Sequence, residues 1–290
     1  MSKIEKALEK AVVMRESMQY AAPNDIKAQP DAQGGTPVFE IGESIVDPAL
    51  VDKHIVCVTD PYSPDAEQYR KLRARLIRDT AKDFRNIIMT ASANRGEGKT
   101  VTSINLAASL AQEIDHTVLL VDADLRMPSI HKYLGIDPKQ GLSDYLKGEA
   151  QLSDALIRTG IGKLVLLPAG SPAENPAELL SSAKMRDLVR EMKTRYKDRY
   201  IIFDSSPTLI TADALSLSRY MDGIIFVIQA DQTPQKDVIK ALSLIKGVPI
   251  LGAVLNNVPQ YLSEGLHSYS DYNYAYIRKP DDGGNGKNPG

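Results

Sequence analysis

The stretch Asn86-Ile-Ile-Met-Thr-Ala-Ser-Ala-Asn-Arg-Gly-Glu-Gly-Lys-Thr-Val-Thr-Ser103 decides the fold of this chain. Its apolar start, Ile87 to Met89, predicts a buried strand, and residues 93–100 have the spacing of a phosphate-binding loop with Ala in place of the first Gly. The glycines let consecutive backbone N–H groups turn toward a phosphate chain, which a Cβ would obstruct. A Gly-rich turn with a purely structural role is the alternative, but the strand before and the helix after favour nucleotide binding.

The residues of this loop predict separate roles in holding a nucleotide. Lys99 is expected to reach the β- and γ-phosphates, and the Thr100 hydroxyl to reach Mg²⁺ at the positive N-terminal end of the next helix. No Asn-Lys-x-Asp guanine motif occurs in the chain, so adenine is the expected base. Asn256, just past the last predicted strand, is a candidate contact for the base, although a turn explains that position equally well. The residues predicted to bind the nucleotide are Asn94, Arg95, Gly96, Glu97, Gly98, Lys99, Thr100, Val101 and Asn256.

Carboxylates follow two further predicted strands. Residues 116–122 form an apolar run that leads into Asp122-Ala-Asp124-Leu-Arg126, and residues 200–204 end in Asp204. Open α/β sheets bind ligands at the carboxyl ends of their strands, so these side chains are expected to converge on the phosphate loop. One carboxylate would face Mg²⁺ and another the attacking group; a strand-ending turn is the alternative for Asp-x-Asp.

The order of the remaining elements predicts the fold class. Strands are expected at 164–168, 223–228 and 248–255, and helices at 65–80, 101–113, 177–195 and 234–246. Strands that alternate with helices in this way predict an α/β P-loop NTPase fold, with a mostly parallel central sheet flanked by helices on both faces.

The composition of the whole chain limits the classes of partner and location. Its 290 residues are 43% hydrophobic and 25% charged, as in ordinary globular proteins, and the formal net charge of −2 leads us to expect no nucleic-acid partner. The single cysteine, Cys57, excludes an internal disulfide and is expected to be a semi-buried apolar residue rather than a reactive thiol. No apolar run approaches the roughly 20 residues that span a bilayer, so the expected location is the cytoplasm.

Four segments are expected along the chain. Residues 1–20 predict an amphipathic helix, residues 21–50 a flexible linker, residues 51–260 the P-loop domain, and residues 261–290 a flexible tail rich in tyrosine. The N-terminal helix needs a partner or its own domain to cover its apolar face, and both interpretations stay open. Tail tyrosines set among polar residues are candidate phosphoacceptors, unless the tail binds a partner without chemistry; the candidates are Tyr269, Tyr272, Tyr274 and Tyr276.

Taken together, the motifs resemble those of the bacterial protein-tyrosine kinases (BY-kinases) of polysaccharide export, in particular the soluble kinases associated with exosortase (PEP-CTERM) loci. Residues 93–100, 119–126 and 201–207 match the three nucleotide-binding motifs of that family. The tyrosine cluster stands at the expected end, and the segment Lys3-Ile-Glu-Lys-Ala-Leu resembles the start of the exosortase-associated subgroup. The Glu-x-x-Arg-x-x-Arg helix, through which family members associate into rings, is matched by Glu67, Arg70 and Arg73.

This resemblance implies an ATP- and Mg²⁺-dependent tyrosine autokinase that phosphorylates its tail in trans within a ring and regulates exopolysaccharide polymerisation and export. Lys99 and the carboxylates would be catalytic: Asp122 would be the base for the tyrosine hydroxyl, and Asp124 and Asp204 would hold Mg²⁺ with Thr100. The roles of Asp122 and Asp124 could be exchanged. The implied partners are further copies of the chain, a membrane chain-length-determinant (polysaccharide co-polymerase) adaptor that recruits it to the inner membrane, and a cognate tyrosine phosphatase.

Two other functions fit part of the sequence. ATPase switches of the partition and cell-division type share the fold and hydrolyse ATP without tyrosine phosphorylation, but they carry a lysine where this chain has Asn94, beside Arg95, and they lack a tyrosine-rich tail. A nucleotide-dependent scaffold, whose main role is ring assembly, is the third hypothesis.

Overall fold

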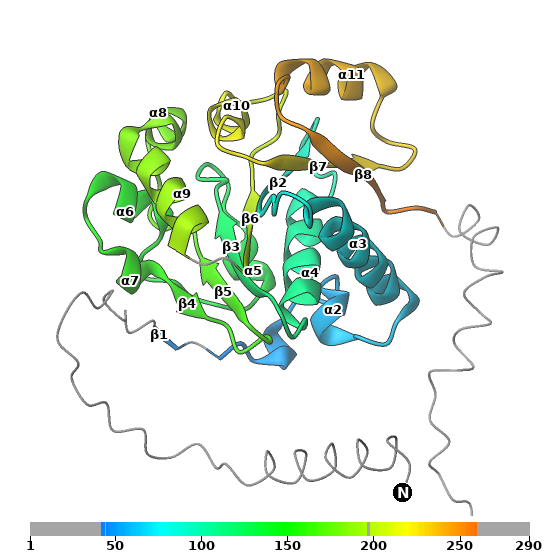
Figure 1. Ribbon diagram of the computed structural model, residues 1–290, viewed down its shortest axis with the longest axis horizontal. Helices are drawn as coiled ribbons and strands as arrows, with labels where there is room; N and C mark the ends of the chain where they lie inside the picture. The colour runs from blue at the N-terminus through cyan, green and yellow to red at the C-terminus, as the bar shows by residue number, and fades with distance from the viewer. Residues whose placement is uncertain (1–41, 44, 196–197, 260–290) are drawn as a thin grey trace, which may run out of the picture. The chain divides into compact units, whose positions relative to one another are not determined.

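A mostly parallel sheet lies at the centre of the computed structural model, which describes residues 42–43, 45–195 and 198–259 (Figure 1). In the described residues the sheet has eight strands in the order β1-β4-β5-β3-β6-β2-β7-β8, and β4 pairs with β5 in the antiparallel sense while the other neighbours are parallel. The predicted fold class is therefore confirmed. The strands are β1 (Gly42–Glu43), β2 (Ile87–Ser92), β3 (Thr117–Asp122), β4 (Ile157–Arg158), β5 (Leu164–Leu167), β6 (Arg199–Asp204), β7 (Gly223–Gln229) and β8 (Ile250–Asn256).

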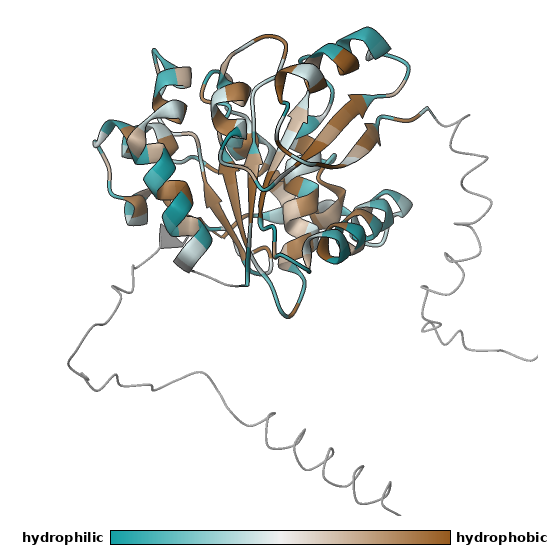
Figure 2. Cartoon of the chain, turned by 45° about the horizontal axis from the view of Figure 1, so that its top comes forward, coloured by the Kyte–Doolittle hydropathy of each residue, from teal (hydrophilic) through white to brown (hydrophobic). Residues whose placement is uncertain are grey.

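Helices cover both faces of this sheet. In β2, Ile87 and Met89 pack into one apolar cluster with α8, α9 and α10, while Ile88 packs into a second cluster with α3 and α4, because successive strand residues point to opposite faces. Figure 2 shows the apolar strands in the interior and hydrophilic residues on the outer sides of the helices. The helices are η1 (Pro48–Leu50), α2 (Val56–Thr59), α3 (Pro64–Thr80), α4 (Lys99–Ala111), α5 (Ile130–Tyr133), α6 (Leu142–Lys147), α7 (Leu152–Ala155), α8 (Pro176–Ser181), α9 (Ala183–Arg195), α10 (Asp213–Ser218) and α11 (Gln235–Leu244).

The single helix predicted over residues 177–195 is wrong, because the chain forms two helices there. Ser182 separates α8 from α9 with an extended backbone (φ −66°, ψ 159°), and its hydroxyl accepts a hydrogen bond from the Met185 N–H at 3.1 Å. A serine in this conformation caps the following helix and competes with continuation of the preceding one. An uninterrupted pattern of helix-forming residues on both sides hides such a break in the sequence.

Part of the segment assigned to the linker by its composition belongs to the fold. Strand β1 extends the sheet by pairing with β4, and Val46 is buried, with its N–H donating to the Thr159 carbonyl at 2.9 Å. A two-residue strand and one buried valine show no periodicity, so neither could be predicted from the sequence. The amphipathic helix predicted for residues 1–20, the first part of the linker and the tyrosine-rich tail lie outside the described residues. None of the helices that the structure describes is long and apolar enough to cross a membrane.

Cys57 is buried in α2, with its N–H donating to the Asn105 side-chain oxygen at 2.9 Å. Burial raises the pKa of the thiol to about 12, so the reactive thiolate is scarce at pH 8. We therefore expect iodoacetamide at pH 8 to alkylate Cys57 on the order of 10³-fold more slowly in the native protein than in the unfolded one. Intact-mass measurements with and without guanidinium check this; rapid native labelling would contradict the buried position of α2.

Candidate active site

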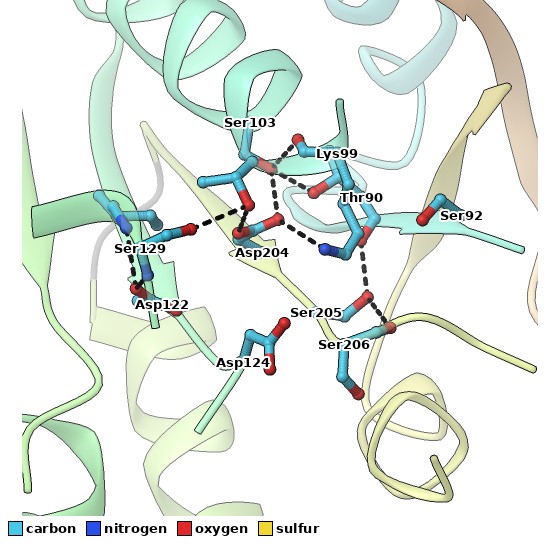
Figure 3. A network of polar contacts seen from close by, with 12 residues as sticks. Thr90, Ser92, Lys99, Ser103, Asp122, Asp124, Ser129, Asp204, Ser205 and Ser206 are labelled. Atoms are coloured by element: carbon cyan, nitrogen blue, oxygen red, sulfur yellow. Dashed lines mark hydrogen bonds and ion pairs between the residues drawn. The ribbon is translucent and has the colours of Figure 1, made fainter. Parts of the chain in front are cut away.

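The three predicted strand ends meet at one edge of the sheet. β6 lies between β3 and β2, and the pairing register places Asp204 beside Asp122 on one side and beside Thr90 on the other. The phosphate loop leaves β2 at this same edge and leads directly into α4. Figure 3 shows Lys99, Asp122, Asp124 and Asp204 gathered there, so the expected convergence of the carboxylates on the loop is confirmed.

The two loop glycines are required for different reasons. Gly96 and Gly98 have φ values of +82° and +86°, a region that L-residues rarely adopt. A Cβ on Gly96 would meet no other atom within 4 Å, whereas one on Gly98 would lie 1.8 Å from the side-chain Nδ2 of Asn256. Gly98 thus provides both the backbone conformation and the space for a close approach of β8.

Asp204 organises the groups that face the loop. Its carboxylate is fully buried and accepts hydrogen bonds from the Thr100 hydroxyl at 2.7 Å and the Ser103 hydroxyl at 3.0 Å. The Lys99 ammonium lies 3.9 Å from the same carboxylate, and Lys99 as a whole is 7% exposed. A buried charge needs such partners to offset the loss of water, so Asp204 fixes Lys99 and Thr100 before a ligand arrives.

Asp122 combines full burial with an unused carboxylate oxygen. Its Oδ2 accepts hydrogen bonds from the N–H groups of Ser129 and Ile130, both at 3.2 Å, while its Oδ1 has no hydrogen-bond partner among the described residues. Burial, and then the neighbouring charge of Asp204, raises the pKa of Asp122 to about 8. A carboxyl with a pKa near the working pH and a free oxygen is suited to accept a proton.

Asp124 lies two residues beyond Asp122, just after the end of β3, and is 9% exposed. Its Oδ1 accepts a hydrogen bond from the Met127 N–H at 3.2 Å, which fixes the start of the loop after β3. Burial raises the pKa of Asp124, while the positive charge of Lys99 acts in the opposite direction. Figure 3 shows the Asp124 carboxylate turned toward the centre of the site, where a cation would reduce the repulsion between the three aspartates.

The residues present fit Mg²⁺ bound together with a nucleotide, but do not form a metal site by themselves. In the described part of the chain, no group of three or more His, Cys, Asp and Glu side chains is arranged to hold a metal ion. Mg²⁺ commonly takes one or two carboxylates and completes its shell with phosphate oxygens and water. Thr100 and Asp204, with the Asp124 carboxylate turned toward the same space (Figure 3), would supply oxygen ligands of this kind.

Several predicted residues are bound to other parts of the protein. The Asn94 side chain donates to Asp237 of α11 at 3.0 Å. Arg95, in contrast, is exposed to solvent. The Asn256 side chain donates to the Glu97 carbonyl at 3.1 Å, which places it against the loop backbone; its contact with a base stays a prediction. The Glu97 carboxylate accepts a hydrogen bond from the Thr233 hydroxyl at 2.7 Å.

Three residues that support the site were not predicted from the sequence: Thr233, Asp237 and Asp213. Asp213 is buried at the start of α10 and accepts two hydrogen bonds from the Arg126 guanidinium, at 2.7 and 3.2 Å. Arg126 therefore anchors the loop after β3. No local motif marks these three residues, and more than 80 positions separate each from its partner.

The helix motif on α3 is engaged within its own chain. Arg70 pairs with Glu67 at 2.6 Å and donates to the Pro61 carbonyl at 2.6 Å. Arg73 donates to the Ser109 carbonyl of α4 at 2.9 Å and pairs with Glu113 at 2.9 Å. Arg73 thus fastens α3 to α4, while Glu67 and Arg70 are more exposed. The candidate acceptors Tyr269, Tyr272, Tyr274 and Tyr276 lie outside the described residues.

The fold and this edge of the sheet define a P-loop nucleotide-binding domain. In agreement, residues 85–249 match the family model described as an AAA domain. The tyrosine-protein kinase YwqD of Bacillus subtilis is 33% identical over 226 residues, which cover 77% of this chain and 92% of that protein. The chain therefore belongs to the bacterial tyrosine-protein kinase family.

Solved structures support the same assignment. The kinase domain of Escherichia coli tyrosine kinase ETK aligns with a TM-score of 0.66 and 32% identity, covering 70% of this chain and 80% of that one. The chimerical protein CapA2B2 has a TM-score of 0.66 and 28% identity, with 77% and 95% covered. The septum site-determining protein MinD of Pyrococcus horikoshii, complexed with Mg-ADP, aligns with a TM-score of 0.51 and 26% identity over 62% of this chain and 76% of that one. The likeness to the tyrosine kinases is therefore greater than the likeness to the cell-division ATPase.

Proposed function

We propose that this tyrosine kinase transfers the γ-phosphoryl group of ATP to tyrosines of its own C-terminal tail, in trans between copies of the chain, with Mg²⁺ as cofactor. The observation that carries this proposal is the buried Asp122, which lies beside the Lys99–Asp204 pair. One of its carboxylate oxygens has no hydrogen-bond partner among the described residues, and its pKa is raised. That arrangement has a group to hold a phosphate chain and a group to accept a proton. The tail supplies four tyrosines as acceptors: Tyr269, Tyr272, Tyr274 and Tyr276.

Phosphoryl transfer depends mainly on positioning and charge, because its transition state is loose. Lys99 and the loop amides would bind the β- and γ-phosphate oxygens, and Asp204 would keep Thr100 and Lys99 in place. Asp122 would take the proton from the tyrosine hydroxyl, whose ordinary pKa is about 10. Mg²⁺, held by Thr100, Asp124 and Asp204, would neutralise charge on the phosphate oxygens.

We further propose that the kinase acts in exopolysaccharide polymerisation and export. The support is its family membership and the order of its motifs, which resemble those of the polysaccharide-export kinases; the exosortase-associated kind is part of this proposal and is suggested by the segment that begins at Lys3. On this proposal a membrane chain-length-determinant adaptor recruits the kinase to the inner membrane, and a cognate phosphatase resets the tail. The segment at residues 1–20 is the part of the chain proposed to contact the adaptor.

The cell-division type of ATPase switch is the competing function, and the phosphate loop argues against it. The position that carries a lysine in those switches holds Asn94, whose side chain is bound to Asp237 of the same chain. Asn94 therefore offers no cation to the phosphates of a neighbouring copy.

The proposed function is tested by incubating the full chain with Mg²⁺-ATP and following both ADP release and phosphotyrosine. We expect phosphate on the tail by mass spectrometry, and we expect a variant with the four candidate tyrosines changed to phenylalanine to lose it. Steady ADP release with no phosphotyrosine in either protein would instead support the ATPase switch.

Assembly into rings through α3 gives a separate prediction. Because Arg73 fastens α3 to α4 whereas Glu67 and Arg70 are partly exposed, the variant Glu67→Ala/Arg70→Ala should lose the large oligomer with little change in Tm, since a partly exposed ion pair within one helix contributes about 0–1 kcal/mol. Size-exclusion chromatography with light scattering measures the oligomer. The comparison variant Arg73→Ala should in contrast lower Tm, because Arg73 fastens α3 to α4. An unchanged oligomer in Glu67→Ala/Arg70→Ala would rule out this face as the subunit contact.

A further inference from the structure

A small polar network joins the phosphate loop to the far edge of the sheet. Its centre is Glu97, a loop residue that is 3% exposed although it carries a carboxylate. Its Oε2 accepts a hydrogen bond from the Asn94 N–H at 3.0 Å, and its Oε1 accepts one from the Thr233 hydroxyl at 2.7 Å. The first bond closes the loop on itself, and the second ties it to the connection between β7 and α11.

Thr233 is held rigidly where it meets Glu97. Its N–H donates to the Gln229 carbonyl at 3.1 Å, and its hydroxyl oxygen accepts from the Gln229 N–H at 3.0 Å. Because Gln229 is the last residue of β7, the turn between strand and helix is fixed to the end of the sheet. The hydroxyl proton of Thr233 is therefore directed at Glu97, since its oxygen already receives the Gln229 N–H.

Two more contacts bring the same edge of the sheet against the loop. Asn256, the last residue of β8, donates to the Glu97 carbonyl at 3.1 Å, and its own carbonyl accepts from the Ala230 N–H at 2.9 Å. Asp237, in the first turn of α11, accepts from the Asn94 side chain at 3.0 Å. The loop is thus held at Asn94 by a residue of α11, and at the backbone and side chain of Glu97 by residues of β8 and of the connection between β7 and α11.

We infer that Glu97 is a positioning residue, and that nucleotide affinity depends on Thr233 through it although Thr233 lies outside the phosphate loop. A loop whose amides already face the phosphates loses less conformational freedom when the nucleotide binds. Removing the Thr233 hydroxyl leaves a buried carboxylate oxygen without its donor, and the loop must rearrange to satisfy it. This inference rests on nucleotide binding at the loop and holds whichever group accepts the phosphate.

The test compares two substitutions at one position. Thr233→Val keeps the shape and removes the hydroxyl, whereas Thr233→Ser keeps the hydroxyl. In the full chain with Mg²⁺ and a fluorescent ADP analogue, we expect Thr233→Val to raise Kd about tenfold, the typical effect of losing one hydrogen bond to a charged group. Thr233→Ser should bind close to wild type. Thr194→Val, an exposed position in α9, is the control and should change nothing.

A double-variant comparison checks that the effect runs through Glu97. Glu97→Ala alone should weaken binding, and adding Thr233→Val to it should have no further effect, because the bond is already absent. The inference is overturned if Thr233→Val binds as tightly as wild type, if Thr233→Ser is as weak as Thr233→Val, or if the effects of Glu97→Ala and Thr233→Val simply add. Since the probe reports binding alone, a failure here is distinct from an absence of tail phosphorylation.

Discussion

Replacing Lys99 with methionine is expected to abolish tyrosine phosphorylation while leaving the protein folded. Methionine has a similar length but no charge, so the β- and γ-phosphate oxygens lose their buried cation, a loss worth roughly 10²–10³-fold in rate when one stabilising group of a transition state is removed. Asp204 keeps the hydrogen bonds from Thr100 and Ser103, which limits the cost to stability. Phosphotyrosine formed per minute and Tm together measure the two effects.

Lys71→Met is the matched control for that experiment. Lys71 lies on the exposed face of α3 and should tolerate the same substitution with no change in rate. A Lys99→Met variant with a rate within tenfold of wild type would show that the phosphate chain is held elsewhere.

The second large effect is expected for Asp122→Asn, which should lose activity and gain stability. An amide cannot take the tyrosine proton, so the rate should fall by roughly 10²–10⁴-fold, the usual contribution of a general base. The amide oxygen can still accept from the Ser129 and Ile130 N–H groups, so the loop geometry is retained. Asp124→Asn, measured beside it, tests whether the two aspartates exchange roles.

The gain in stability follows from the direction of the pKa shift. Burial and the charge of Asp204 raise the pKa of Asp122 in the folded, ligand-free protein from its ordinary 3.8 to about 8. Between these values the folded state binds more protons than the unfolded state, so Asp122 lowers stability progressively as pH rises from about 4 to 8. Asp122→Asn removes that dependence. A gain on the order of 2 kcal/mol in the free energy of unfolding at pH 8 would raise Tm by roughly 4–8 °C.

This stability prediction is measured without nucleotide and in the presence of a chelator, at pH 6 and pH 8. The Tm difference between Asp122→Asn and wild type should be larger at pH 8. A variant that is less stable than wild type at pH 8 would show that the Asp122 carboxylate is better solvated than its burial indicates.

The convergence of the phosphate loop and the carboxylates could be predicted because each of these parts is local in the sequence. The loop from Ala93 to Thr100 follows an apolar strand directly, and Asp122 and Asp204 each end a run of apolar residues. Parallel strands place such ends at one edge of the sheet, so the convergence of these residues followed from the fold class.

The supports of the site could not be predicted, because they join residues that are distant in the chain. Thr233 and Glu97 are 136 positions apart, and a lone threonine in a turn carries no pattern. In the sequence Asp213 resembles an ordinary acidic residue in the first turn of a helix, and only the structure shows that it accepts hydrogen bonds from the Arg126 guanidinium. The break at Ser182 was hidden for a related reason, since a serine can either continue a helix or cap the next one.

The most direct test of the central claim mixes two full-length variants with Mg²⁺-ATP. One has an intact site but phenylalanine in place of Tyr269, Tyr272, Tyr274 and Tyr276; the other is Lys99→Met with its tail unchanged. Mass spectrometry then locates the phosphate. We predict phosphotyrosine on the tail of the Lys99→Met chain, which can come only from the site of the other copy. ADP release without phosphotyrosine on either chain would contradict the proposal that the tail accepts the phosphate.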